Sequence, residues 1–239
     1  MQRLAGPQLA GQQLEDDRAA SLLDAQSKAD DLFRQIERDG LIRPGLKETE
    51  LNQQIYDLAH RLFGVDTYWH KRIVRAGHNT LLPYDENPPD LVLKEDDILF
   101  LDLGPVFAEW EADFGRTFVL GNDPHKLKLR ADVETAFAEG KRYFHEHPEI
   151  KANEFYHYAT SLATKHGWEF GGPIAGHLLG QFPHERIPND KISLYVHPEN
   201  PLRMSDPDSD GRFRHWILEI HFVDRARKIG GFYEQLLTL

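Results

Sequence analysis

Apolar residues in the first quarter of the chain recur at the spacing of amphipathic helices. Between residues 14 and 40 they fall on one helical face, and Gly40 marks the predicted end. The same pattern returns over residues 49–64, where Gly64 follows the last apolar turn. We therefore predict two helices, whose apolar faces carry Leu22, Leu23, Ala29, Leu32, Phe33 and Ile36 in the first and Leu51, Ile55, Leu58, Ala59 and Leu62 in the second.

Two dense apolar runs follow a stretch that is rich in turn residues. Residues 78–90 carry several Pro, Asn and Asp residues, so we expect them to run over the surface. Residues 91–107 and 109–121 have the composition of two strands. Helical periodicity then returns over about 131–144 and about 153–166, which predicts two further helices.

The last third of the chain contains three segments of different composition. Residues 171–185 are apolar and rich in glycine, which indicates backbone packed close to another group. Residues 186–214 contain several Pro, Asp, Asn and Ser residues and are expected to form a long loop, before two strands over 215–224 and 230–239. With no repeat and no linker, the chain is predicted to be a single α+β domain over residues 1–239.

Composition narrows the function classes. The 239 residues are 40% hydrophobic and 28% charged, as in a globular domain, and the net charge of −11 argues against nucleic acid or an anionic membrane as partner. No stretch has the apolar length of a signal peptide or a membrane span, which predicts a cytoplasmic protein. The chain has no cysteine, so a metal ion would be held by carboxylate and imidazole groups.

Two acids interrupt the first pair of predicted strands. A hairpin that turns near Phe107 and Ala108 puts Asp102 directly opposite Asp113, with Cβ atoms about 4.5–5.5 Å apart. Facing carboxylates destabilise a buried hairpin unless one is protonated or a cation lies between them. For this pair alone, a solvated hairpin with both acids in water is the commoner alternative.

Two more acids interrupt apolar strands near the end of the chain. Glu219 stands in "WILEIHFVD" and Glu234 in "GGFYEQLLTL". Arg116, three residues after Asp113, could neutralise one of the four acids. The others need more positive charge than nearby basic residues supply, and two divalent cations would offset all four carboxylates.

Histidines in the glycine-rich segment add to this pattern. His177 and His184 stand seven residues apart in "GHLLGQFPHE". A lone histidine on an apolar face is more often a hydrogen-bonded core residue than a ligand. Two histidines beside four strand acids favour a metal site.

The ordered set Asp-x10-Asp, Gly-His-x6-His-Glu and two strand glutamates resembles the pita-bread metallohydrolases, over residues 15 to 239. This family includes methionine aminopeptidase, aminopeptidase P, prolidase and creatinase. The resemblance implies a curved antiparallel sheet with flanking helices and a site for two divalent metal ions, among which Mn, Co, Fe and Zn suit such ligands. It also implies a peptide or dipeptide substrate, and a homodimer, since relatives are often dimers.

The resemblance assigns roles to individual residues. The five metal-ligand positions of the family match Asp102, Asp113, His177, Glu219 and Glu234. His184 matches the histidine that contacts the substrate, and Glu219 is the carboxylate that could also move a proton. His184 and Glu219 are therefore the predicted catalytic residues.

Departures from the family pattern concern the substrate side. Proline-specific relatives have a histidine where this chain has Pro173, and another where it has Tyr84. The proline that usually follows the strand glutamate is replaced, and His221 stands nearby. His78, Tyr84 and His221 are the candidate substrate-binding residues. Creatinase, aminopeptidase P and prolidase usually have an additional amino-terminal domain, and we expect none here because 239 residues are too few to include it.

These features predict a dinuclear-metal exopeptidase that removes an amino-terminal residue or splits a dipeptide. The segment "ADFGRTF" favours an Xaa-Pro type, whereas "GGFYEQ" is closer to methionine aminopeptidase. A creatinase-like enzyme that hydrolyses another C–N bond and a binding protein without catalysis on the same fold are the alternatives. The loop over 186–214 could form a subunit contact or cover the site.

Overall fold

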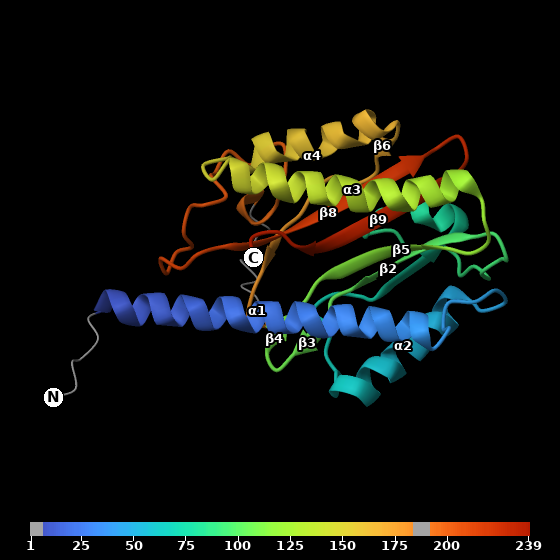
Figure 1. Cartoon of the computed structure of the whole chain (residues 1–239), viewed down its shortest axis with the longest axis horizontal. Coiled ribbons are helices and arrows are strands. Elements are labelled where there is room, and N and C mark those ends of the chain that lie inside the picture. Colours follow the sequence, from blue (N-terminus) through green and yellow to red (C-terminus); the bar gives the residue numbers. More distant parts are fainter. Residues whose placement is uncertain (1–6, 184–191) are drawn as a thin grey trace.

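The computed structural model describes residues 7–183 and 192–239 and has the predicted α+β architecture (Figure 1). Its elements run in the order α1 Pro7–Arg38, α2 Glu48–Phe63, β1 Ile73–Ala76, the 3-10 helix η1 Gly77–Leu81, β2 Ile98–Leu103, β3 Val106–Phe107, β4 Trp110–Glu111, β5 Phe114–Val119, α3 Pro124–Glu146, α4 Ala152–His166, β6 Glu169–Phe170, β7 Leu178–Leu179, the 3-10 helix η2 Ile192–Leu194, β8 His215–Asp224 and β9 Ile229–Leu236.

One antiparallel sheet organises the described part of the chain. Its strands lie in the order β1-β2-β5-β9-β8-β6, and β7 pairs with β8 outside this path. The two central strands, β5 and β9, therefore join the first half of the chain to its last strands. Beside this sheet, β3 and β4 form a small hairpin of their own.

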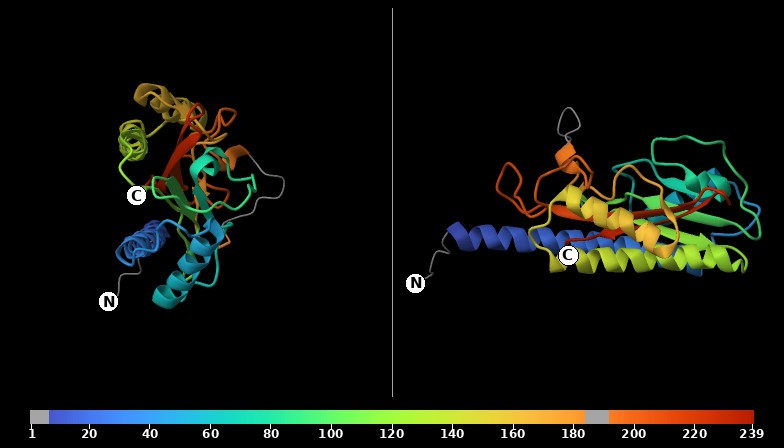
Figure 2. Two further views of the ribbon diagram at one scale, coloured as in Figure 1. Left: turned by 90° about the vertical axis from the view of Figure 1, so that its right-hand side faces the viewer. Right: turned by 90° about the horizontal axis from the view of Figure 1, so that it is seen from above.

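The four helices pack on one face of the sheet, as the side and end views show (Figure 2). One pair, α1 and α2, covers β1, β2 and β5, and the other, α3 and α4, covers β8 and β9. The apolar side chains of the strands that meet these helices are Val74, Ala76, Leu99, Leu101, Leu103, Phe114, Leu218, Ile220 and Phe222.

The residues between these apolar positions point to the opposite face, because side chains alternate along a strand. We call this the cavity face. Ile73, Phe100 and Phe232 form a small apolar cluster there. Asp102 and Glu234 share the same parity, so both acids lie on the cavity face.

Local sequence explains where the predicted helices differ from the observed ones. The helix predicted from about residue 131 begins at Pro124, because Asp123 accepts hydrogen bonds from the amides of His125 and Lys126 as an N-cap. The second predicted helix ends as expected, with Gly64 in the left-handed conformation. No helix in the described ranges combines the length and apolar character needed to cross a bilayer.

The surface course predicted for residues 78–90 is wrong for its first residues. Asn79 and Thr80 are fully buried in η1. The Asn79 side-chain amide donates to both carboxylate oxygens of Glu48, and Thr80 Oγ1 accepts the Gly230 amide at 2.7 Å. These contacts tie the loop to α2 and to β9, which a local turn signal does not reveal.

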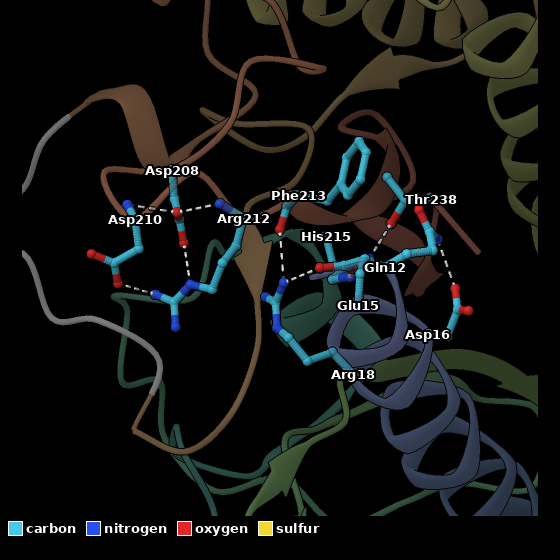
Figure 3. Close-up of polar contacts among 10 residues, drawn as sticks. All are labelled: Gln12, Glu15, Asp16, Arg18, Asp208, Asp210, Arg212, Phe213, His215 and Thr238. Atoms are coloured by element: carbon cyan, nitrogen blue, oxygen red, sulfur yellow. Dashed lines mark hydrogen bonds and ion pairs between the residues drawn. The ribbon is translucent and has the colours of Figure 1, made fainter. Parts of the chain in front are cut away.

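The amino-terminal half of α1 is joined to the carboxyl end of the chain (Figure 3). His215, the first residue of β8, contacts Glu15 through its Nε2 at 2.8 Å, and Arg18 donates to the Phe213 carbonyl at 3.3 Å. Thr238 Oγ1 lies 3.5 Å from Nδ1 of the same histidine. These contacts fix the helix along one end of β8.

Candidate metal centre

Three acids lie in one row across the sheet. Asp102 on β2 pairs with Gly115 on β5, Gly115 with Glu234 on β9, and Glu234 with Glu219 on β8. A Cβ atom on Gly115 would lie 2.5 Å from the Phe232 ring and 3.0 Å from the Glu234 Cβ. The glycine therefore leaves the space between two carboxylates free of any other side chain.

The fourth acid, Asp113, stands just before β5. The expected pairing of Asp113 with Asp102 is wrong, because Asp102 pairs with Gly115 two residues further on. The hairpin turns at Ala108 and Glu109, which both have positive φ, one residue later than predicted. A shift of two residues keeps a side chain on the same face, so Asp113 still joins the cavity face.

His177 reaches the acids from the glycine-rich segment. A Cβ on Gly176 would lie 2.2 Å from the carbonyl oxygen of Ile217 on β8, so the segment can approach this strand only with glycine there. The His177 Nδ1–H donates to the Leu178 carbonyl at 2.8 Å. Its Nε2 lies 3.1 Å from Oδ2 of Asp113.

A second imidazole, that of His70, lies among the acids and is not among the predicted residues. Its Nε2 is 3.5 Å from Oδ1 of Asp102 and 3.3 Å from Oδ1 of Asp113, and its side chain is 7% exposed. Its Nδ1–H donates to the Lys71 carbonyl at 2.7 Å. In the sequence it is marked only by its place next to Trp69, before an apolar run, and no spacing motif links it to the acids.

The donor atoms form two groups that share Asp113. Within each group, one possible ligand atom from every residue lies within 4.8 Å of the others. The first group is His70, Asp102 and Asp113, and the second is Asp113, His177 and Glu234. Glu219, opposite Glu234 in the sheet, adds a fourth carboxylate. The arrangement suits two neighbouring cation positions with Asp113 between them.

Burial makes three of the carboxylates hard to ionise together. It raises the pKa of Asp102 to about 7, with the nearby charge of Asp113 adding to the effect. Burial and the repulsion of Asp102 and Asp113 also raise the pKa values of Glu219 and Glu234 well above the usual glutamate value. A cation in their midst would favour the ionised forms.

The pKa values of His70 and Asp113 are shifted in the direction that favours their charged forms. Burial lowers the pKa of His70, but Asp102 and Asp113 outweigh it and raise that pKa to about 9. Burial alone would raise the pKa of Asp113, yet His70 and His177 lower it below its usual value. The centre therefore favours positive charge on both sides of Asp113.

The donor set fits divalent metal ions. Oδ1 of Asp102 and Oε1 of Glu219 are buried and accept no hydrogen bond from the described residues. Buried carboxylate oxygens need a partner, and a cation is one that two carboxylates can share. The imidazoles fit as well, since a metal-binding histidine ordinarily donates its other ring N–H to a carbonyl or carboxylate, as His70 and His177 do.

A cavity of about 600 Å³ opens over these groups. The residues of the two donor groups and Glu219 form part of its lining, and the apolar cluster of Ile73, Phe100 and Phe232 forms another part. The loop around Tyr84 and the segment around Ile174 complete its walls. The cavity is large enough for a small peptide and presents both carboxylates and an apolar wall to it.

The predicted substrate-binding residues have different positions. Tyr84 lines the cavity, and its hydroxyl accepts the Lys71 amide at 3.2 Å. His221 also lines it but is buried, and its Nε2–H donates to the Thr80 carbonyl at 2.8 Å. Burial lowers the pKa of His221 to about 4, so its ring is neutral. His78 is exposed on η1, and His184 lies outside the described residues.

Arg116 does not neutralise a carboxylate of the centre. Its guanidinium lies on the helix side of β5, between the rings of Phe114 and Tyr233 at 3.6 and 3.8 Å from their centroids. It donates to the main-chain carbonyl of Glu234 at 2.8 Å. It therefore holds the backbone of β9 against β5 while the carboxylate of Glu234 points to the other face.

Comparison with known proteins identifies a family. Residues 20–206 match metallopeptidase family M24. A curated relative, an Xaa-Pro dipeptidase of Pyrococcus horikoshii, is 26% identical over 145 residues, which are 60% of this chain and 40% of that protein.

Solved structures share the fold. A dipeptidase from Pyrococcus horikoshii superposes with a TM-score of 0.73 at 24% identity, covering 97% of this chain and 60% of that one. A methionine aminopeptidase from Rickettsia prowazekii gives 0.69 at 18% identity, covering 94% and 98%. The chain thus spans less than two thirds of the two Pyrococcus proteins but nearly all of the Rickettsia one.

Proposed function

Because the chain belongs to metallopeptidase family M24, we propose that it is a dinuclear-metal exopeptidase. It hydrolyses the bond after the amino-terminal residue of a peptide or dipeptide, with Xaa-Pro substrates preferred. The observation that carries this proposal is the row of Asp102, Glu234 and Glu219 on the floor of the cavity, with Asp113 and His177 beside it.

The ions would be held by the five residues of the family pattern. These are Asp102, Asp113, His177, Glu219 and Glu234. Bound divalent ions lower the pKa of a water molecule and polarise the carbonyl group of a peptide bond. Mn, Co, Fe and Zn all suit a set of carboxylates with imidazole.

The side chains of the chain itself would move the proton. Glu219 Oε1 accepts no hydrogen bond from the described residues, and the pKa of Glu219 is raised by burial and by Asp102 and Asp113. Ionised by neighbouring cations, a carboxylate can take a proton from the attacking water and return it to the leaving amine. Glu219 would do so at Oε1, and His184 would contact the substrate carbonyl.

The preference for proline rests on the cavity wall and on the relatives. The wall beside Asp102 is formed by Ile73, Phe100 and Phe232, which are nonpolar and nearly fully buried. A pyrrolidine ring can pack against such a wall without leaving an amide hydrogen unpaired, since proline has none. The curated relative and one solved neighbour are dipeptidases, the former named for Xaa-Pro.

A metal and substrate panel tests the proposal. Purified protein is stripped with a chelator, its metal content is measured after reloading with Mn, Co, Fe or Zn, and release of amino acids is followed from Xaa-Pro and Met-Xaa dipeptides. We expect two ions per chain and turnover of Xaa-Pro, with none from amino-terminally acetylated peptides. If the protein bound two ions but cleaved no peptide with a free amino terminus, the proposed peptidase activity would be refuted and a binding function favoured.

His184 provides a separate test of the substrate side. Changing His184 to Ala should leave the metal content unchanged and lower kcat, because this residue is proposed to contact the substrate rather than the ions. Full activity in the variant would remove His184 from the site.

A further inference from the structure

His70 is held in a defined orientation at the edge of the metal centre. Trp69 donates its main-chain N–H to the Gly104 carbonyl at 2.9 Å and its indole Nε1–H to the Ala112 carbonyl at 3.1 Å. The Lys71 carbonyl accepts the His70 Nδ1–H. The hydrogen bonds of Trp69 and of the Lys71 carbonyl thus fix the orientation of the His70 ring.

Gly104 makes room for this ring. A Cβ at position 104 would lie 2.4 Å from His70 Nε2 and 2.5 Å from the indole nitrogen of Trp69. Both distances are far below van der Waals contact, so any other residue would displace the imidazole. The same indole packs edge-on against His70 and His177, with ring centroids 4.4 and 5.0 Å away.

The hydrogen bond at Nδ1 determines what Nε2 can do. A carbonyl oxygen only accepts, so Nδ1 carries the ring hydrogen of the neutral imidazole. Nε2 faces Oδ1 of Asp102 at 3.5 Å and Oδ1 of Asp113 at 3.3 Å, and it hydrogen-bonds the latter when it is protonated. In the neutral ring, its lone pair and the two carboxylate oxygens need a positive charge between them, which a bound cation would supply in place of the proton.

The spacing of these atoms suits a single ion. Two ligands about 2.1 Å from one ion at a tetrahedral angle lie about 3.4 Å apart. The separations from His70 Nε2 to Asp102 and Asp113, 3.5 and 3.3 Å, bracket this value. On the other side of Asp113, the corresponding separation to His177 Nε2 is 3.1 Å.

We propose that His70 is a sixth metal ligand. With Asp102 and Asp113 it makes one metal position, while Asp113, His177 and Glu234 make the other. Each ion then receives one imidazole, and each oxygen of the Asp113 carboxylate faces one of them. This inference rests on the proposed function, because it assigns a residue to the same metal centre.

A second imidazole changes which metals the centre prefers. Carboxylates with water favour Mn and Mg, whereas imidazole favours Zn, Co and Fe. The position that contains His70 should therefore bind Co and Zn more tightly than Mn. Replacing His70 with alanine should reduce the difference between the affinity for Co or Zn and the affinity for Mn.

Metal titration of variants tests the assignment. Metal-free wild type, His70→Ala and His60→Ala are titrated with Co²⁺ and with Mn²⁺ by calorimetry, and the visible absorption of bound Co²⁺ is recorded. His60 is the matched control, since it is an exposed histidine on α2 that pairs with Asp66. We expect His70→Ala to weaken one of two Co²⁺ sites by at least about 10–100-fold, the cost of losing even an outer partner.

The same variant should change the Co²⁺ spectrum and lose less affinity for Mn²⁺, whereas His60→Ala should match wild type. Unchanged or tighter Co²⁺ binding in His70→Ala would overturn the proposal.

A measurement on the wild type keeps the test independent of variant folding. In the Co²⁺-loaded protein, paramagnetically shifted proton NMR should reveal two exchangeable imidazole N–H signals, one from each Nδ1. A single signal with two bound ions would exclude His70 as a ligand.

The outcomes separate this inference from the function. Wild type that binds fewer than two ions would contradict the proposed dinuclear centre. Wild type that binds two ions and cleaves peptides, with one imidazole signal and an unchanged His70→Ala variant, would leave the function standing and remove only His70.

Discussion

The two faces of β8 have opposite chemistry. Leu218, Ile220 and Phe222 point toward α3 and α4 and are fully buried in an apolar core. Glu219 and His221 alternate with them and point into the cavity. On the helix side, burial stabilises the fold by about 25 cal/mol for each Å² of apolar surface. On the cavity side, burial makes the carboxylates harder to ionise.

This difference separates stability from chemistry within one strand. A change on the helix face should alter the free energy of unfolding and leave metal binding intact. Replacing an acid of raised pKa on the cavity face should alter metal binding and leave the metal-free fold as stable as before, or more so. The following predictions test this separation.

The largest effect is expected at Asp113, whose two carboxylate oxygens face the two imidazoles. Asp113→Asn should weaken metal binding more than about 100-fold, since loss of an outer partner alone costs 10–100-fold. Turnover should fall to background, and the metal-free protein should still unfold cooperatively. Calorimetric metal titration and urea unfolding measure both quantities, and wild-type metal affinity in this variant would contradict the site.

The converse change is made on the helix side of β8, at Leu218. Leu218→Ala should lower the free energy of unfolding by about 2–5 kcal/mol, because the truncated side chain leaves a cavity against α3. Metal content at saturating Mn²⁺ should equal that of wild type. Loss of bound metal in a folded Leu218→Ala protein would show that the two faces are coupled.

The cavity face should also give the metal-free protein a pH dependence. The pKa values of Asp102, Glu219 and Glu234 are raised by burial, and that of His70 is raised to about 9 by its acidic neighbours. Groups whose pKa is raised bind their protons more tightly in the folded than in the unfolded state. Their contribution to the free energy of unfolding is therefore complete below the pKa of the unfolded state, and it is lost as the pH rises through the pKa of the folded state.

The free energy of unfolding of the metal-free protein should therefore fall between about pH 4.5 and 9. Asp113 and His221, whose pKa values are lowered, have the opposite sign: Asp113 acts only below its ordinary value, and His221 offsets part of the fall between about pH 4 and its ordinary value. Saturating Mn²⁺ should reduce the fall, because the ions replace the protons. Urea unfolding at pH 5, 7 and 9, with and without Mn²⁺, measures the free energy of unfolding. An increase of this free energy with pH in the metal-free protein would contradict the prediction.

The smallest effect is expected from relieving repulsion at Glu219. Glu219→Gln should raise the melting temperature of the metal-free protein by about 2–4 °C, the shift that 1 kcal/mol produces in a chain of this size. Glu199→Gln, at an exposed position, is the control and should change nothing. Scanning calorimetry checks both, and a lower melting temperature for Glu219→Gln would mean that the ionised carboxylate stabilises the fold.

Much of the fold follows from local pattern. The periodicity of α1 and α2 and the glycine at the end of α2 were sufficient to predict both helices. The strands around the acids were predicted from their dense apolar runs. Strand β1 was not predicted, since its four residues, three apolar and one a buried arginine, give too short a signal.

Register and long-range packing were harder to predict. The hairpin turn lies one residue later than expected, because Ala108 and Glu109 adopt positive φ although neither is glycine or asparagine. His70 was missed because nothing in its neighbourhood indicates a ligand. Its position depends on Gly104, to which a segment from before β1 is hydrogen-bonded.

The sequence by itself was enough to predict that four acids interrupt apolar strands and stand, with His177, in an order that resembles the family. Side chains alternate along each strand with a period of two, but which residues of different strands face one another depends on the register. The partners of each acid, and the entry of a second imidazole, depended on the folded chain. Those contacts join segments that are far apart in sequence, and they form only where Gly104 and Gly115 leave space for them.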